Sequence, residues 1–194
     1  MKIKNDVCSV TISVDETYTF NSADQKKYDI VFNPDNYENG DYFKALKIHI
    51  DTFSKAYTIL LIGDYYYDDT NSAVLEGDIL TVLHNEDITQ LRVTDGLIIQ
   101  RVHIPTLGTN FAIYKVSAKY IIHGEIDIIC LDDKFNKLWS FSGRDIWYSC
   151  TNKNPFEICL DRIKLYDFYD NYYEIDFEGK LLMDKTSDQW NKLV

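Results

Sequence analysis

The chain has 194 residues, of which 45% are hydrophobic and 26% are charged, and its formal net charge is -11. This composition is typical of a folded soluble protein with one domain by default, and it excludes a disordered or fibrous chain. The charge is uneven, because residues 1–97 hold 17 acidic and 8 basic side chains and residues 98–194 hold 14 and 12. The first half therefore carries a negative field that repels nucleic acid and anionic lipid and attracts a cationic partner, although such a surface also serves solubility alone.

The longest apolar run is YTILLIG at 57–63, far shorter than the roughly 18–20 residues of a membrane-spanning helix. No membrane association is expected. Polar residues interrupt the start, MKIKNDVCSVTISVDE, so it lacks the apolar stretch of a secretory leader, and we expect a cytoplasmic protein. The four cysteines show no C-x-x-C spacing, and most of them are expected to be small buried thiols. A Cys150–Cys159 disulfide is conceivable, but the cytoplasm would keep that pair reduced.

Short runs with alternating apolar and polar residues predict strands along most of the chain. In ALKIHID at 45–51, for example, Leu46, Ile48 and Ile50 alternate with polar side chains. Similar runs lie at 7–14, 78–83, 89–93, 96–104, 110–116, 119–131, 156–160 and 161–168. Helical spacing is confined to the short segments 22–28, 39–46 and 186–194.

A repeated turn pattern divides the second half of the chain. Gly96, Asn136 and Gly179 each come within three residues after an aspartate, precede a new apolar run and lie 40 and 43 residues apart. Glycine and asparagine tolerate a positive φ, so each residue is expected at the tip of a tight hairpin. A spacing of about 40 to 45 residues is that of four-stranded propeller blades, and further turn signals at KVSAKY and DFYDNYY fit four strands per unit.

The segment LDDKFNKLWSF at 131–141 resembles the hairpin of the PQQ-type β-propeller repeat, with Asn136 at the usual glycine position and one residue fewer before Trp139. The resemblance covers residues 96–182 and about two repeats, whereas a closed propeller needs about four or more blades. It carries over no quinone or calcium site. More broadly, the order LLIG, GTNFAIY, IIHGEIDIICLD, WSFSGRDIW and YYEIDFEGKLL resembles small acidic bacterial proteins of unassigned function, some of which are immunity partners of secreted toxins.

We therefore expect a mainly β fold with antiparallel sheets, in which a sandwich-like N-terminal part continues into an incomplete propeller-like stack of hairpins. The expected organisation is a single domain over residues 1–194. A division into two lobes is the alternative, with a β layer at 1–90, blade-like hairpins at 91–183 and a tail or short helix at 184–194.

The best candidate for metal binding is HGEID at 123–127. Alternate side chains of a strand share one face, so His123, Glu125 and Asp127 would project together and could hold a divalent ion. The simpler interpretation is a solvated polar face opposite Ile122, Ile126 and Ile128. No nucleophile motif, phosphate loop or calcium loop is present, and we predict no catalytic residue and no cofactor.

Two segments, YENGDYF at 37–43 and GDYYYDD at 63–69, interleave tyrosines with carboxylates in expected loops. Tyrosine offers a stiff contact area and carboxylates pair with Arg and Lys, so together they could cover a basic groove such as a nuclease active site. The alternative is that the tyrosines line a core rim and the acids are solvated. The candidate partner-binding residues are Tyr37, Glu38, Asp41, Tyr42, Asp64, Tyr65, Tyr66, Tyr67, Asp68 and Asp69.

The leading functional hypothesis from the sequence is a non-enzymatic protein-binding module, most concretely an immunity protein that neutralises a basic toxin. One alternative is a metal-dependent enzyme or ligand-binding protein that uses the face formed by His123, Glu125 and Asp127. The other is a structural protein that associates with itself through an unpaired strand edge.

Overall fold

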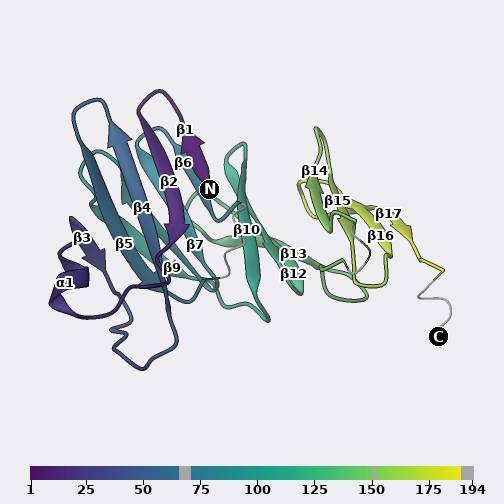
Figure 1. Ribbon diagram of the computed structural model, residues 1–194. Coiled ribbons are helices and arrows are strands. Elements are labelled where there is room, and N and C mark those ends of the chain that lie inside the picture. Colours follow the sequence, from purple (N-terminus) through teal and green to yellow (C-terminus); the bar gives the residue numbers. More distant parts are fainter. Residues whose placement is uncertain (66–70, 150, 152, 189–194) are drawn as a thin grey trace. The chain divides into compact units, whose positions relative to one another are not determined.

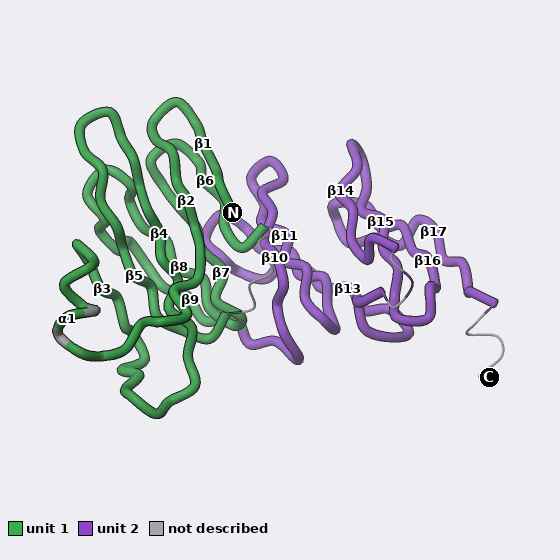
Figure 2. Tube along the Cα trace, viewed as in Figure 1, with its two compact units in different colours: residues 1–104 green, residues 105–194 purple. Residues whose placement is uncertain are grey.

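The computed structural model describes residues 1–65, 71–149, 151 and 153–188. It divides into two compact units, residues 1–104 and residues 105–194 (Figure 2). Both consist almost entirely of strands, which confirms the expected mainly antiparallel β class. The division differs from the expected lobe boundary at 90/91, because that boundary falls inside a strand that runs from Asp87 to Arg92. Within the described residues, the helical content is a single turn at Ser22–Gln25 (α1), too short to cross a membrane.

Unit 1 begins with a five-stranded sheet in the order β1-β2-β4-β5-β3 (Figure 1). Its neighbours are antiparallel except for β3, which runs parallel to β5. Its strands are β1 (Lys2–Lys4), β2 (Cys8–Val14), β3 (Ile30–Phe32), β4 (Lys44–Thr52) and β5 (Ala56–Gly63).

The second sheet of unit 1 is a four-stranded antiparallel meander in chain order. Its strands are β6 (Ala73–Glu76), β7 (Ile79–His84), β8 (Asp87–Arg92) and β9 (Ile98–His103). Period-two patterning in the sequence predicted each of these strands except β6, where AVLE is too short to show a clear alternation.

The two sheets of unit 1 share one apolar core, as expected for a sandwich-like part. Ile48 and Ile50 of β4 are fully buried and belong to the same cluster as Leu80 and Val82 of β7. Alternation along each strand places these side chains on one face, so each sheet supplies half of the core. The other face of the five-stranded sheet is covered by aromatic residues of the segment between β2 and β4, including Tyr18, Phe20 and Phe43.

Unit 2 contains two four-stranded antiparallel meanders. The strands of the first are β10 (Asn110–Val116), β11 (Lys119–Gly124), β12 (Asp127–Leu131) and β13 (Lys137–Ser142). Those of the second are β14 (Phe156–Ile158), β15 (Ile163–Tyr166), β16 (Tyr172–Ile175) and β17 (Leu181–Lys185).

The core of unit 2 lies between these two sheets. Ile128 and Cys130 of the first sheet and Leu165 and Ile175 of the second are fully buried in one cluster. Trp147, from the segment that joins the two sheets, is also fully buried there. The connecting segment therefore contributes its largest side chain to the core and fixes one sheet against the other.

The other face of the second sheet of unit 2 is charged. Glu157, Lys164 and Glu174 stand opposite one another in neighbouring strands, and Arg162 forms a 2.6 Å ion pair with Glu174. A further apolar sheet packed on this face would remove these charges from water at a large cost in free energy. This face therefore terminates the apolar packing of unit 2.

The last hairpin of each four-stranded sheet has the same geometry. In each hairpin, one residue of the turn has a positive φ, and it lies two positions before the first paired residue of the outer strand. These residues are Gly96 (φ 79°), Phe135 (φ 64°) and Gly179 (φ 79°). Each hairpin then has a register shift that leaves one extra residue in the outer strand. These extra residues are Ile99, Leu138 and Leu182, which are 46%, 49% and 48% exposed.

This register corrects the predicted position of the middle turn. Phe135, rather than Asn136, occupies the position that glycine takes in the other two hairpins, so the turns lie 39 and 44 residues apart. Trp139 then follows the turn at the same distance as Met183 follows Gly179. Phe135 is 5% exposed, so burial of its ring compensates for a backbone conformation that L-residues disfavour.

The helix predictions had mixed outcomes. The segment 22–28 contains α1, but the helix expected at 39–46 is wrong, because β4 starts at Lys44 and pairs with β2 and β5. Propensity in that short segment is weaker than the pairing available on both sides of β4. Most of the segment 186–194 lies outside the described residues. Cys8, Cys130 and Cys159 are free thiols, and Cys150 lies outside the described residues.

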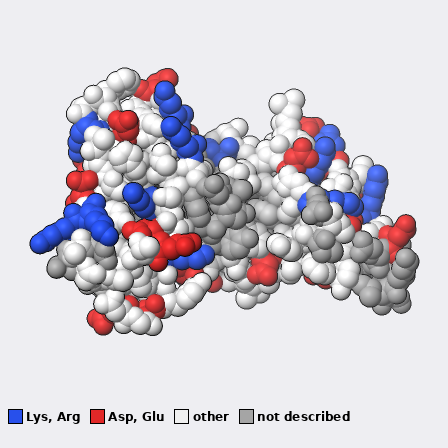
Figure 3. All heavy atoms as spheres, viewed as in Figure 1, with Lys and Arg blue, Asp and Glu red and all other residues white. Residues whose placement is uncertain are grey.

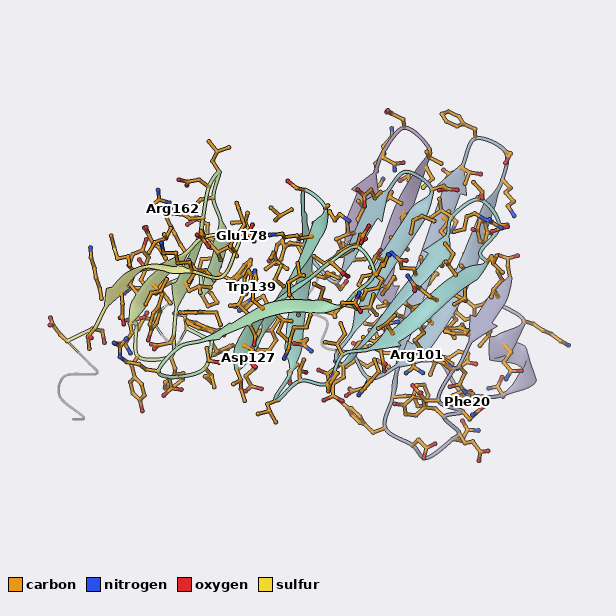
Figure 4. All side chains as sticks on the ribbon, turned by 180° about the vertical axis from the view of Figure 1, so that it is seen from behind. Phe20, Arg101, Asp127, Trp139, Arg162 and Glu178 are labelled. Atoms are coloured by element: carbon orange, nitrogen blue, oxygen red, sulfur yellow. The ribbon has the colours of Figure 1, made fainter. Side chains whose placement is uncertain are left out.

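The contact between two neighbouring hairpins gives a test of this register. A Cβ atom on Gly179 would lie 2.7 Å from Cδ2 of Trp139, whose indole N–H donates to the Phe177 carbonyl at 3.2 Å (Figure 4). Gly179→Ala should therefore lower the free energy of unfolding by about 2–4 kcal/mol, which combines the cost of a positive φ with overpacking. Urea denaturation followed by circular dichroism measures this loss.

The matched control is Gly77→Ala. Gly77 also has a positive φ (57°), but a Cβ atom there would meet open space. Its loss should be only the backbone cost of about 1–2 kcal/mol. Equal losses in the two variants would show that the Trp139 contact does not constrain residue 179.

Candidate functional site

A hollow of about 480 Å³ lies in unit 1 where strand ends of its two sheets meet. The five-stranded sheet contributes the loop after β3 and the residue after β5, and the second sheet contributes the β7–β8 turn and β9. The lining residues are Asp35, Tyr37, Asp64, His84, Asn85, Glu86, Asp87, Arg101 and His103. The hollow thus brings four carboxylates, one guanidinium and two imidazoles into one site.

The β7–β8 turn supplies four consecutive lining residues. His84 and Asp87 are paired at the ends of the two strands, and Asn85 takes a positive φ of 51° between them. Asparagine is among the few residues that adopt this conformation readily. The Asn85 amide donates a 3.1 Å hydrogen bond to Asp64, which fixes the end of β5 against this turn.

Arg101 of β9 is the central charge of the site (Figure 4). Its two terminal nitrogens each lie 2.7 Å from an Asp35 oxygen, and one of them also lies 2.6 Å from Asp87. Burial alone would lower the pKa of the guanidinium, but the hydrogen bond to Asp35 and the charges of Asp87 and Asp35 raise it. Arg101 is therefore a permanently charged group already shared by two carboxylates.

Asp87 also contacts the second histidine of the hollow. It stands opposite His103 in the β8–β9 pair, and one of its oxygens lies 3.3 Å from His103 Nδ1. One carboxylate thus holds both Arg101 and His103 in place. The His103 side chain itself is 61% exposed.

His84 forms the buried wall of the hollow. Its ring stacks on Tyr65 at a centroid distance of 4.5 Å, and its Nε2 lies 3.5 Å from the Tyr65 hydroxyl. Burial, with a smaller contribution from the Arg101 charge, lowers the pKa of His84 to about 3. His84 is therefore neutral at physiological pH, and its buried Nδ1 has no hydrogen-bond partner within the part of the chain that the structure describes.

The formal charge of the hollow is negative, because its lining holds four carboxylates and one guanidinium. The pKa of Tyr37 is raised, first by burial and then by the charges of Asp35, Asp64 and Asp87, and only Arg101 opposes these effects. A phenol resists ionisation where negative charges already dominate. The hollow is therefore suited to a cation rather than to an anion.

The sequence-predicted residues of the first tyrosine-rich segment lie in different environments. Tyr37 lines the hollow, whereas Glu38 and Asp41 are exposed in one turn, where Asp41 accepts a 2.8 Å hydrogen bond from the Glu38 backbone N–H. Tyr42 is 79% exposed and lines a separate hollow of about 560 Å³ in unit 1, beside Asp15 and others. The structure therefore does not gather these residues into a single patch.

The second tyrosine-rich segment is only partly described. Asp64 is exposed and lines the hollow, whereas Tyr65 is 2% exposed and supports His84 from beneath. Tyr65 is thus unavailable as a surface contact. Tyr66, Tyr67, Asp68 and Asp69 lie outside the described residues.

Sequence reasoning missed most of the hollow. Asp35 and Arg101 are 66 residues apart, and their ion pair follows only from how the two sheets meet. A local signal existed for the turn, since HNED at 84–87 interrupts two apolar strands with polar and charged residues. Such turns are common, so this signal alone does not indicate a site.

The structure contradicts the interpretation of HGEID as one strand. β11 ends at Gly124 and β12 starts at Asp127, because the chain reverses there and pairs His123 with Ile128. The His123 ring is buried and stacks on Phe156 at 4.8 Å, and its Nε2 lies 3.2 Å from the Trp147 carbonyl. These contacts are those of a core histidine.

The other two members of that motif also have structural contacts. Glu125 accepts a 3.0 Å hydrogen bond from the Thr109 backbone N–H, and Asp127 accepts one from the Ser142 hydroxyl. Across the described ranges, no group of three or more His, Cys, Asp or Glu residues is arranged to hold a metal ion. The described residues therefore give no support to the alternative metal site at His123, Glu125 and Asp127, and the burial of His123 also departs from the solvated polar face expected there.

Comparison with known proteins identifies the fold alone. Neither a protein-family model nor a curated protein matches the sequence. Among solved structures, the chain is similar to BamB from Moraxella catarrhalis, with 12% identity and a TM-score of 0.50 over 75% of this chain and 47% of that one. It is also similar to the computationally designed Ika8 protein, with 9% identity and a TM-score of 0.52 over 78% of this chain and 48% of that one.

The structural neighbours are of propeller type, which confirms the propeller-like part of the expected fold. The chain spans less than half the length of each of these two structures. At such low identities, this similarity shows a propeller-like β fold and assigns no activity.

Protonation of His84 makes the stability of unit 1 sensitive to acid. The folded state holds the pKa of His84 at about 3, whereas the unfolded chain takes up this proton below about pH 6.5. The contribution of neutral His84 to the free energy of unfolding is therefore fully present above about pH 6.5. It is lost as the pH falls, by about 2 kcal/mol at pH 5. His84→Phe, which keeps a flat ring against Tyr65, should remove this loss.

Urea denaturation at pH 7 and pH 5 measures the difference. His49→Gln is the matched control, because His49 is an exposed histidine of the same unit, and this variant should keep the acid sensitivity of the original protein. If His84→Phe loses as much stability between the two pH values as the control, burial of His84 is not the source of the effect.

Proposed function

We propose that the protein is a non-enzymatic protein-binding module whose unit 1 receives a cationic protein. The observation that supports this proposal is the hollow, in which Asp35, Asp64, Glu86 and Asp87 face one guanidinium. Two of these carboxylates, Asp35 and Asp87, already pair with Arg101. The remaining negative charge is available to a partner.

Long-range charge supports the same proposal. Most of the net negative charge lies in residues 1–97, and such a field accelerates the approach of a positively charged protein. On the face shown in Figure 3, acidic side chains of unit 1 form a group with basic side chains beside it. A mixed arrangement of this kind gives orientation to the encounter as well as attraction.

The most concrete form of this proposal is an immunity protein that occludes a basic, nuclease-like toxin in the cytoplasm. A nuclease active site binds phosphates with Arg and Lys, so carboxylates on a rigid sheet framework can take the place of the nucleic acid. Tyr37 would add contact area beside these carboxylates. Coexpression with a toxin encoded by the neighbouring gene tests this form directly, because an immunity protein restores growth.

The hollow is a better binding site than a catalytic one. The Asp87–His103 pair has the composition of a general-base pair, but the described lining contains no serine, threonine or cysteine that could act as a nucleophile. His84 is neutral and buried, and Asp87 is shared with Arg101. The contacts of Asp87 with Arg101 and His103 therefore serve to hold the side chains of the hollow in position.

The hairpin geometry disfavours self-association through one edge of each four-stranded sheet. The outer strands β9, β13 and β17 each contain the register shift described above. A bulge in an edge strand disturbs the row of backbone donors and acceptors that a second chain would need.

Charge reversal at Asp64 tests the proposed function once a cationic partner is identified. Asp64→Lys should slow association at least about fivefold at low salt and change dissociation less, because a charge near the contact acts mainly on the encounter. The effect should shrink at high ionic strength. Stopped-flow mixing at two salt concentrations measures both rates.

Asp51→Lys provides the control, since Asp51 is an exposed carboxylate of β4 that does not line the hollow and the variant has the same net charge. It should change the association rate by less than half of the Asp64→Lys effect on a logarithmic scale. Equal effects, or no effect of Asp64→Lys, would contradict binding at the hollow.

A further inference from the structure

We propose that the hollow receives an arginine side chain of the partner, so that the ligand chemistry is a guanidinium ion. This inference rests on the proposed function and specifies what the cationic partner places in the site. It is argued from the division of the carboxylates, the state of His84 and the planar donor set of guanidinium.

The carboxylates of the hollow fall into two pairs. Asp35 and Asp87 are engaged by Arg101 at 2.6 to 2.7 Å and neutralise its charge. Asp64 accepts a hydrogen bond from the neutral Asn85 amide, and within the described ranges no cation forms an ion pair with Asp64 or Glu86. The second pair is therefore the one that an incoming cation would meet.

Arg101 does not exclude a second cation, because two carboxylates, those of Asp35 and Asp87, pair with its single positive charge. Four carboxylates against one guanidinium leave the lining with an excess of negative charge, and the pKa of Tyr37 is raised, first by burial and then by Asp35, Asp64 and Asp87 against the opposing effect of Arg101. A positively charged group entering beside Tyr37 would reduce this excess of negative charge. The Tyr37 ring also offers a surface on which a planar cation can stack.

His84 is an independent indication of a ligand. It is 3% exposed, lines the hollow and has a buried Nδ1 that makes no hydrogen bond within the described residues. A buried polar atom without a partner costs about 1–3 kcal/mol, and a bound donor that reaches Nδ1 would recover this free energy. A neutral imidazole has no charge to repel a cation, so burial of His84 keeps the wall compatible with one.

The chemistry of the lining favours guanidinium over ammonium. A volume of about 480 Å³ lies within the range of roughly 300–1,000 Å³ found for small-molecule sites, so the hollow admits either group. Guanidinium is planar, weakly hydrated and carries five donors in a fixed fork. These donors match a site that offers two carboxylates and a tyrosine ring at its rim.

Three synthetic peptides test the inference: Gly-Gly-Arg-Gly-Gly and the same sequence with lysine or with citrulline at the centre. Citrulline has the shape of arginine without its charge. NMR titrations of the full chain should give the tightest binding for arginine, at least about fivefold weaker binding for lysine and no binding for citrulline. The arginine peptide should also shift the imidazole nitrogen signals of His84.

Variants locate the binding. D64N combined with E86Q should weaken the arginine peptide at least about tenfold. E16Q combined with D51N removes two exposed carboxylates of unit 1 outside this hollow and should change affinity less than twofold. Similar losses in the two double variants, or no movement of the His84 signals, would overturn the inference.

The outcome separates this inference from the proposed function. Equal binding of the arginine and lysine peptides, with the expected loss in D64N/E86Q, rejects guanidinium selectivity and leaves a cation-binding hollow. If no peptide binds and a cationic protein still associates in the Asp64-dependent manner described above, the arginine inference fails alone. If that association is also absent, the proposed function fails with it.

Discussion

The structure depends on the burial of apolar sheet faces against one another within each unit. In unit 1, Ile48 and Ile50 of one sheet and Leu80 and Val82 of the other are removed from water together. This packing also forms the candidate site, since Asp35 and Asp64 extend from one sheet and Asp87 and Arg101 from the other. The distances between these charges are set by core side chains that carry no charge themselves.

Strands and turns were predictable because their signals are local. Alternation with a period of two identified β4 and β7, and turn chemistry identified the last hairpin of each four-stranded sheet. The same reasoning placed the middle turn at Asn136, because a phenylalanine with a positive φ has no sequence signal. It also extended one strand through HGEID, where alternation continues across a turn and conceals it.

The site was predictable only in part, for a related reason. Composition singled out Tyr37 and Asp64, because acidic and aromatic residues cluster around them in the sequence. The pairing of Arg101 with Asp35 depends on two separate sheets, and no local pattern encodes it. The burial of Tyr65 against His84 has the same origin, so the sequence does not distinguish an exposed tyrosine that could bind a partner from a buried one that packs against the site. Fold similarity to propeller-type structures does not resolve this, because such frameworks serve unrelated functions.

The extra residues Ile99, Leu138 and Leu182 have a wider consequence. Each adds an aliphatic side chain at the rim without belonging to the apolar clusters inside the units. Within each of these strands, the residues that pack in the core and the aliphatic residues exposed to solvent therefore occupy different positions. These three positions can therefore change without disturbing the apolar clusters that hold the sheets of each unit together.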